Sequence, residues 1–291
     1  MKKINFKKIL SWKLLLIVIV IVLLAIISSK TKPTTSSDWQ SIIESDKPQF
    51  SPGWGERKSV GVNTDKWEDG AYISGDGNSL YYAYYPDDLY NNVLTGKFKD
   101  DIDVYYSQKP FTKAKKHPIS EDFWSEGGVM FAGSDIYYMS NRNRLNADDI
   151  YKNGQVVINT TNKSEQDPHY CAAENELYFW IDGVIYINKN NQTKVLPAPI
   201  NDGNRNIQPF LTPNCQEMYF SSTRGNGNMK IFKSKRLGEE TWGQPEVVAS
   251  SQVAVGEPTL TDNGNTLFFV QIFRSPQGAM NADIFYVERM K

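Results

Sequence analysis

The chain has 291 residues, 32 lysines and arginines against 33 aspartates and glutamates, and a formal net charge of −1. Because the charges nearly balance and no long tract carries one sign, the sequence lacks the basic surface expected of a nucleic-acid-binding protein. Aromatic residues make up 13% of the chain, and amphipathic helical patterns are scarce after residue 45. This composition favours an all-β domain of roughly 240 residues.

The N-terminus carries a membrane-targeting signal. Residues 1–13 include five lysines, and residues 14–27 form the wholly apolar run LLLIVIVIVLLAII. A membrane span needs about 20 residues, and the segments on either side extend the run if Lys13 snorkels. Since no good pair of small residues marks a cleavage site, we interpret residues 14–29 as an uncleaved transmembrane signal anchor. Residues 1–13 are then cytoplasmic and the rest is extracytoplasmic; a cleaved secretory signal peptide is the alternative.

The segment after the apolar run is polar. Residues 29–38, SKTKPTTSSD, are rich in Ser and Thr, so we predict a flexible linker over residues 30–50. Within it, WQSIIES at residues 39–45 is long enough for one short helical turn. Residues 51–291 then form the globular domain.

This domain contains a repeated pattern. Each copy opens with an acid or amide followed by Pro or Gly, continues as a short strand and a turn, and reaches an apolar–aromatic–aromatic triplet. The copies begin at Asp69, Glu126, Asp167, Gln208 and Glu257. A third strand follows each triplet, and the pattern recurs at intervals of about 40–56 residues, which is typical of propeller blades. The longest interval contains an insertion at residues 86–101, which we place in a loop.

The two ends of the domain complement one another. The chain stops after the third strand of the last copy, at DIFYVERMK, so that copy lacks an outer strand. A spare outer strand stands at the start, where Trp54 precedes Asp69 by fifteen residues, as Trp242 precedes Glu257. Since an open edge strand is a liability, we predict that residues 54–62 pair with the last copy. This closes a five-bladed β-propeller over residues 51–291.

The acid-Pro strand, the DGN-type turn and the LYF and DIY strands resemble the WD-like propeller repeats of the TolB type. The resemblance covers about 230 residues through all the copies. Copies four and five match best, whereas copies two and three lack the usual Pro-Asp-Gly turn. The resemblance implies a propeller of a kind found in exported protein-binding modules, in sensors and in side domains of peptidases. It implies no role for any particular residue.

The residues that open the copies are the first candidates for a site. Equivalent positions before the innermost strands should surround the central channel at one mouth, which would bring four carboxylates and one amide together. They are Asp69, Glu126, Asp167, Gln208 and Glu257. Such a ring could bind a cation or a basic or polyhydroxylated ligand. The simpler interpretation is that each side chain accepts backbone hydrogen bonds at the entry to its strand.

Two tryptophans accompany this ring. Trp67 and Trp124 each lie two residues before a ring acid. Aromatic side chains beside carboxylates would suit a peptide or sugar ligand at the mouth. Packing between blades is the alternative role for both.

Catalytic patterns are weaker. Paired carboxylates facing each other across the channel would suit a glycoside hydrolase, and Asp69, Asp167 and Glu257 supply the groups, but a repeat supplies such acids anyway. The sequence has no Gly-x-Ser-x-Gly elbow, no phosphate-binding glycine loop and only two histidines, His117 and His169. We therefore expect no catalytic residues and no cofactor.

The remaining candidates concern metal and redox chemistry. Cys171 and Cys215 are the only cysteines; an exported domain permits a disulfide between them, but the sequence leaves open whether they meet. Asp103, Asp149 and Asp283 each lead into a third strand, where they cap the strand more simply than they bind calcium. We predict no metal site.

Together these observations predict a single-pass membrane protein with a propeller on the extracytoplasmic side. We expect the propeller to be a non-catalytic platform that binds an envelope protein, peptide or glycan at the channel mouth. An envelope glycoside hydrolase that uses the mouth carboxylates is the alternative.

Overall fold

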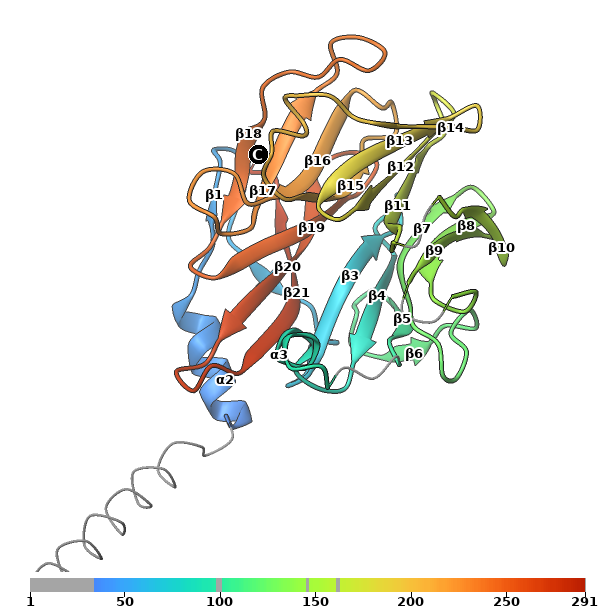
Figure 1. Cartoon of the computed structure of the whole chain (residues 1–291). Helices are drawn as coiled ribbons and strands as arrows, with labels where there is room; N and C mark the ends of the chain where they lie inside the picture. The colour runs from blue at the N-terminus through green and yellow to red at the C-terminus, as the bar shows by residue number, and fades with distance from the viewer. Residues whose placement is uncertain (1–33, 98–100, 145–146, 161–162, 291) are drawn as a thin grey trace, which may run out of the picture.

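The computed structural model describes residues 34–97, 101–144, 147–160 and 163–290. Its strands form two four-stranded sheets, one five-stranded sheet and one eight-stranded sheet, arranged around a central axis (Figure 1). The all-β prediction and the propeller arrangement are therefore confirmed.

Each repeat contributes an innermost strand next to the axis and then strands that follow outward in antiparallel order. The innermost strands are β3 (Trp67–Ile73), β7 (Glu126–Ala132), β11 (Gln166–Cys171), β15 (Asn206–Leu211) and β19 (Ala254–Leu260). The second strands are β4 (Ser79–Tyr85), β8 (Asp135–Ser140), β12 (Glu176–Ile181), β16 (Glu217–Ser222) and β20 (Thr266–Arg274). The third strands are β5 (Asp103–Gln108), β9 (Asp149–Lys152), β13 (Val184–Lys189), β17 (Lys230–Lys235) and β21 (Met280–Glu288). Outer strands are β6 (Ala114–Lys116), β10 (Gln155–Ile158), β14 (Gln192–Val195) and β18 (Glu246–Ser250).

The aromatic triplets lie on the second strands and fill the space between sheets. Successive side chains of a strand point to opposite faces, and neighbouring sheets cover both faces of these strands. The last residue of each triplet is accordingly buried. These residues are Tyr82, Tyr138, Phe179, Phe220 and Phe269.

The N-terminal strand pairs with the last repeat, as predicted for residues 54–62. Strand β2 (Lys58–Ser59) runs antiparallel to β21, and Trp54 forms a further antiparallel bridge with Arg289. Trp242 forms the same bridge with Arg236 in the preceding repeat. In both pairs the guanidinium lies over the indole ring, at 3.9 Å and 5.0 Å respectively.

The prediction of a flexible linker is wrong for residues 36–50. Helix α2 (Ser36–Ser45) starts with a capping box between Thr35 and Asp38, and β1 (Gln49–Phe50) pairs with β18. Residues 39, 42 and 43 lie on one face of the helix. There Trp39 is 7% exposed and packs on the core with Ile42 and Ile43 beside it. The short helical turn suggested for residues 39–45 is present and forms part of this ten-residue helix.

The predicted anchor at residues 14–29 lies outside the described residues. Within the described ranges, no helix has the length and apolar character needed to cross a bilayer.

A disulfide joins the third and fourth repeats. Cys171 ends β11, Cys215 lies in the turn between β15 and β16, and their Cα atoms are 6.0 Å apart. The sequence left open whether the two cysteines meet, and the packing of these neighbouring repeats brings them together.

Candidate functional site

Each innermost strand carries a β-bulge at the same depth. Its pairing with the second strand skips two residues, for example between Gln166 and His169, and the first residue skipped has a positive φ between 48° and 59°. Such a bulge redirects the local side chain, here toward the axis. The five bulge residues are Gly70, Gly128, Asp167, Gln208 and Glu257.

The bulge register corrects the predicted ring of equivalent residues. Asp167, Gln208 and Glu257 hold equivalent positions, as expected. In the first two repeats, however, glycines occupy those positions, and Asp69 and Glu126 lie one and two residues earlier. The first two repeats resembled the other three in sequence because an acid stands just before the glycine in each of them.

A cavity of about 520 Å³ is lined by four of these bulge residues, Gly70, Asp167, Gln208 and Glu257. We call it the funnel; Asp69, Asp167, Gln208 and Glu257 lie at its base, and Arg205 and Trp180 contribute to its wall. Below it the channel narrows to a cavity of about 50 Å³, the neck, lined by the bulge residues and the two residues after each of them. Beyond the neck a cavity of about 240 Å³ opens on the opposite side.

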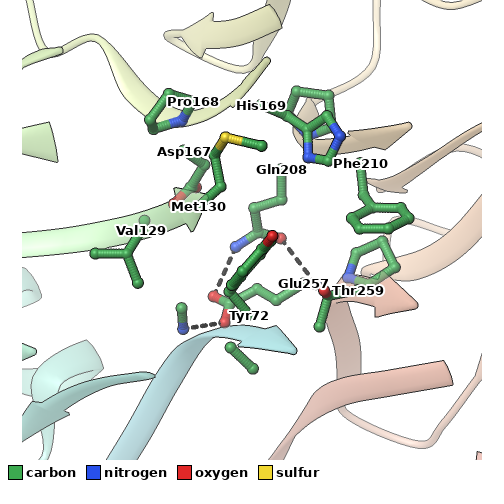
Figure 2. Close-up of a pocket in the computed structure, with 15 residues that line it drawn as sticks. Tyr72, Val129, Met130, Asp167, Pro168, His169, Gln208, Phe210, Glu257 and Thr259 are labelled. Atoms are coloured by element: carbon green, nitrogen blue, oxygen red, sulfur yellow. Dashed lines mark hydrogen bonds between the residues drawn. The ribbon is translucent and has the colours of Figure 1, made fainter. Parts of the chain in front are cut away.

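The neck separates the two mouths. Figure 2 shows side chains from different inner strands turned toward one another there, among them Tyr72, Met130, His169 and Phe210. The rings of His169 and Phe210 are 4.7 Å apart, and burial lowers the pKa of His169 to about 4. His169 is therefore a neutral packing residue, and the side chains of the neck leave a cavity of only about 50 Å³ between the two mouths.

Three carboxyl groups share the base of the funnel. Glu257 accepts hydrogen bonds from the backbone N–H of Gly70 and, at 2.7 Å, from Nε2 of Gln208 (Figure 2). Burial raises the pKa of Asp69 to about 7 and that of Asp167 to about 6. Burial, and then repulsion from Asp69 and Asp167, raises the pKa of Glu257 well above its ordinary value. At neutral pH these groups hold fewer negative charges than three free carboxylates would.

Glu126, which was predicted to join this group, has a different role. Its Oε1 accepts hydrogen bonds from Arg142 at 2.9 Å and from Ser140 at 3.1 Å, and only 1% of the residue is exposed. Although it borders the funnel, its charge is neutralised by Arg142 within the second repeat. Glu126 therefore forms a structural ion pair with Arg142 beside the site.

The tryptophans near the funnel also differ from the prediction. Trp67 is buried in the core, and its Nε1 donates to Asp69 at 2.5 Å. Trp124 is partly exposed but does not line the funnel in the described part of the chain. Trp180 does line it: its Nε1 donates to Asp167 at 2.7 Å, and Arg205 lies 5.0 Å from its ring. The sequence signal for Trp180 was its place in the aromatic second strand, which suggested packing alone.

The Asp residues before the third strands are engaged by protein groups. Lys116 pairs with Asp103 at 2.8 Å, Arg144 pairs with Asp149, and Asn281 donates to Asp283. Among the described residues, no three His, Cys, Asp or Glu side chains are placed to hold a metal ion together.

A scan against protein-family models finds no match, and no curated protein matches in sequence. Solved structures do resemble the chain. The catalytic domain of the GH62 alpha-L-arabinofuranosidase of Coprinopsis cinerea is 9% identical with a TM-score of 0.51, over 81% of this chain and 96% of that one. The TolB of Acinetobacter baumannii is 14% identical with a TM-score of 0.46, over 79% of this chain. This chain spans 56% of the length of that TolB. At such identities the likeness concerns the fold alone.

Proposed function

We propose that this chain is a membrane-anchored, extracytoplasmic five-bladed β-propeller that binds an envelope protein, peptide or glycan in the funnel without transforming it. The observation that carries the proposal is the composition of the funnel. A 520 Å³ concavity brings carboxyl groups, the Gln208 amide and Arg205 together beside apolar side chains. A few convergent polar groups in an otherwise apolar concavity are the usual form of a ligand site.

The blade number rests on the way the eight-stranded sheet is built. One parallel residue pair, Ala282 with Trp67, joins β21 to β3, whereas the other strands of that sheet pair over several residues. We take this single pair as a contact between two blades. The equivalent bridges of Trp54 and Trp242 support N-terminal closure of the last blade.

The cellular location rests on the N-terminal sequence. Five lysines before an apolar run of fourteen residues orient an anchor with its N-terminus inside. The Cys171–Cys215 disulfide supports an oxidising compartment for the propeller. Protease added to intact cells should digest the propeller once any outer layer of the envelope has been made permeable. A propeller that still resists digestion in such cells would count against this location.

The test of binding compares three forms of the full-length chain in lipid nanodiscs. They are the parent, an Asp69→Asn/Asp167→Asn/Glu257→Gln variant and a control with three exposed, ion-paired carboxylates changed, Glu217→Gln/Glu240→Gln/Glu288→Gln. Each is applied to arrays of envelope glycans and peptides after its thermal unfolding has been checked. We expect a ligand bound by the parent and the control and lost by the funnel variant. Equal binding by all three forms would remove the funnel from the proposal.

A second candidate, a glycoside hydrolase, is favoured by one observation. A general acid must carry a proton near neutral pH, and Asp167, with a pKa raised to about 6 mainly by burial, lies in the same cavity as Asp69. Release of reducing sugar by the parent, absent in Asp167→Asn, would establish this activity in place of simple binding.

A further inference from the structure

The wall of the funnel includes a helix that exposes most of its apolar side chains. Helix α3 (Leu89–Leu94) belongs to the insertion in the first repeat, and none of its residues is buried. Polar groups attach it to the propeller: Asp88 accepts from the backbone N–H of Met280 at 2.7 Å, and Asn91 donates to the carbonyl of Gly278 at 2.9 Å. The helix is therefore attached by these polar groups together with the half-buried Leu89, which packs on the core.

Apart from Leu89, the apolar side chains of α3 are exposed. Leu89 and Val93, one turn apart, line the funnel. Tyr90, Val93 and Leu94 are 43%, 57% and 67% exposed. An apolar helix face that is left uncovered beside a concave site is typical of an interaction surface. We call Leu89, Tyr90, Val93 and Leu94 the α3 wall.

Charge defines what could cover this wall. Asp69, Asp148, Asp167 and Glu257 line the funnel, and Arg205 is the one cationic lining side chain among the described residues. Glu126 adds no net charge because Arg142 pairs with it at 2.9 Å. Burial leaves the base carboxyl groups partly protonated at neutral pH, but a cation beside them favours their charged forms. The occupant that fits best therefore brings positive charge to the base and apolar groups to the wall.

We infer that the funnel receives a peptide segment in which a lysine or arginine is flanked by apolar residues, with the cationic head at the carboxylates and the apolar neighbours on the α3 wall. This inference rests on the proposed function that the funnel binds a ligand. An aminophospholipid also combines an amine with apolar chains. However, it would place a phosphate close to its amine, and therefore against like charges at the base. A polyamine carries the charge but leaves the α3 wall uncovered.

The test uses defined peptides and the full-length chain in phosphatidylcholine nanodiscs, with empty nanodiscs subtracted. Isothermal titration calorimetry compares acetyl-Leu-Lys-Leu-Leu-amide with the same peptide carrying norleucine in place of lysine. We expect the lysine peptide to bind at least about tenfold more tightly, since a charged hydrogen bond is stronger than a neutral contact. The tighter binding should disappear in Asp69→Asn/Asp167→Asn/Glu257→Gln.

A matched pair of variants tests the α3 wall. Val93→Ser/Leu94→Ser should weaken the lysine peptide about tenfold. Val195→Ser/Leu237→Ser removes the same side-chain types at 50% and 69% exposure elsewhere on the surface, and should leave the affinity unchanged.

Three outcomes would overturn the inference: no binding of the lysine peptide, equal binding of the norleucine peptide, or an unchanged affinity in Val93→Ser/Leu94→Ser. Binding that appears only when phosphatidylethanolamine replaces phosphatidylcholine would overturn it in favour of a lipid. If a glycan instead binds in a carboxylate-dependent way, the peptide inference fails and the proposed function stands. If no ligand depends on the carboxylates, both fail.

Discussion

The indole N–H of Trp67 donates a hydrogen bond of 2.5 Å to the carboxylate of Asp69. Trp180 holds Asp167 in the same way at 2.7 Å. Two acids at the base of the funnel are thus held by indole donors, one from the same strand (Trp67 for Asp69) and one from the neighbouring strand (Trp180 for Asp167). Burial still raises the pKa of Asp69 to about 7, because this hydrogen bond offsets only part of the desolvation.

We expect Asp69→Asn to stabilise the protein at neutral and high pH but not in acid. The amide keeps an oxygen that accepts from Trp67, but it carries no charge. At pH 8.5 the parent must ionise Asp69 in a desolvated position, so the variant should unfold a few degrees higher, at about 2–4 °C per kcal/mol for a domain of this size. The penalty builds up between the unfolded pKa of about 3.9 and the folded pKa of about 7, so the two melting temperatures should agree only near pH 3.5, where the carboxyl is protonated in both states. Equal melting temperatures at both pH values, measured by differential scanning calorimetry, would contradict this account.

A second pair of buried acids should make stability depend on pH. Glu68 and Asp283 are 0% and 2% exposed. Burial raises the pKa of Glu68 to about 7. Burial and then repulsion from Glu68 raise the pKa of Asp283 to about 8 against the opposing effect of Arg57. Carboxyl groups with raised pKa values stabilise the fold while they are protonated, and that contribution is lost as pH rises through those values.

Between pH 6.5 and pH 8.5 the melting temperature should therefore fall by about 5 °C or more. His169 does not contribute in this window because its pKa is lowered to about 4. In the double variant Glu68→Gln/Asp283→Asn the melting temperature should depend less on pH. The dependence that remains should include the part due to Asp69. A melting temperature that rises with pH in the parent would show that these groups ionise freely.

Reduction of the Cys171–Cys215 disulfide should destabilise the domain. The two residues are 44 positions apart, and closing a loop of that size constrains the unfolded chain by about 4 kcal/mol as an upper figure. We expect a lower midpoint in guanidinium chloride when the parent is reduced. Cys171→Ser/Cys215→Ser should match the reduced parent and should not respond to the reductant. If the reductant also shifted the unfolding midpoint of that variant, the shift would have a cause other than the disulfide.

Closure of the ring should depend on Trp54. Trp54→Ala removes a buried indole beneath Arg289 and should cost about 3–5 kcal/mol. Hydrogen exchange in residues 54–62 should become faster than in the rest of the domain, because β2 loses its support. Trp242→Ala, at the equivalent bridge of the preceding repeat, should cost a similar amount without selectively exposing residues 54–62. Uniform exchange in both variants would argue against separate release of the N-terminal strand.

Much of the fold was predictable from the sequence because its repeats are local patterns. The aromatic triplets, the turns and the spare strand near Trp54 each follow from alternation and spacing within a few dozen residues. The pairing of β2 with β21 could be predicted since one chain end lacked the strand that the other end had left over. Helix α2 was anticipated only as one short turn at residues 39–45, because the stripe of Trp39, Ile42 and Ile43 gains meaning only when the core beneath it is known.

The sequence by itself determined which repeats bring acids to the axis, since each copy opens with one or with an amide. The tertiary structure decided which of these acids meet. Successive side chains of a strand point to opposite faces, and a bulge interrupts this alternation. A shift of one or two residues relative to the bulge therefore placed Gly70 and Gly128 at the ring and left Glu126 paired with Arg142. The tertiary structure also brought Trp180 and α3 to the same cavity. Residues so far apart in the chain meet only through packing, which local patterns do not encode.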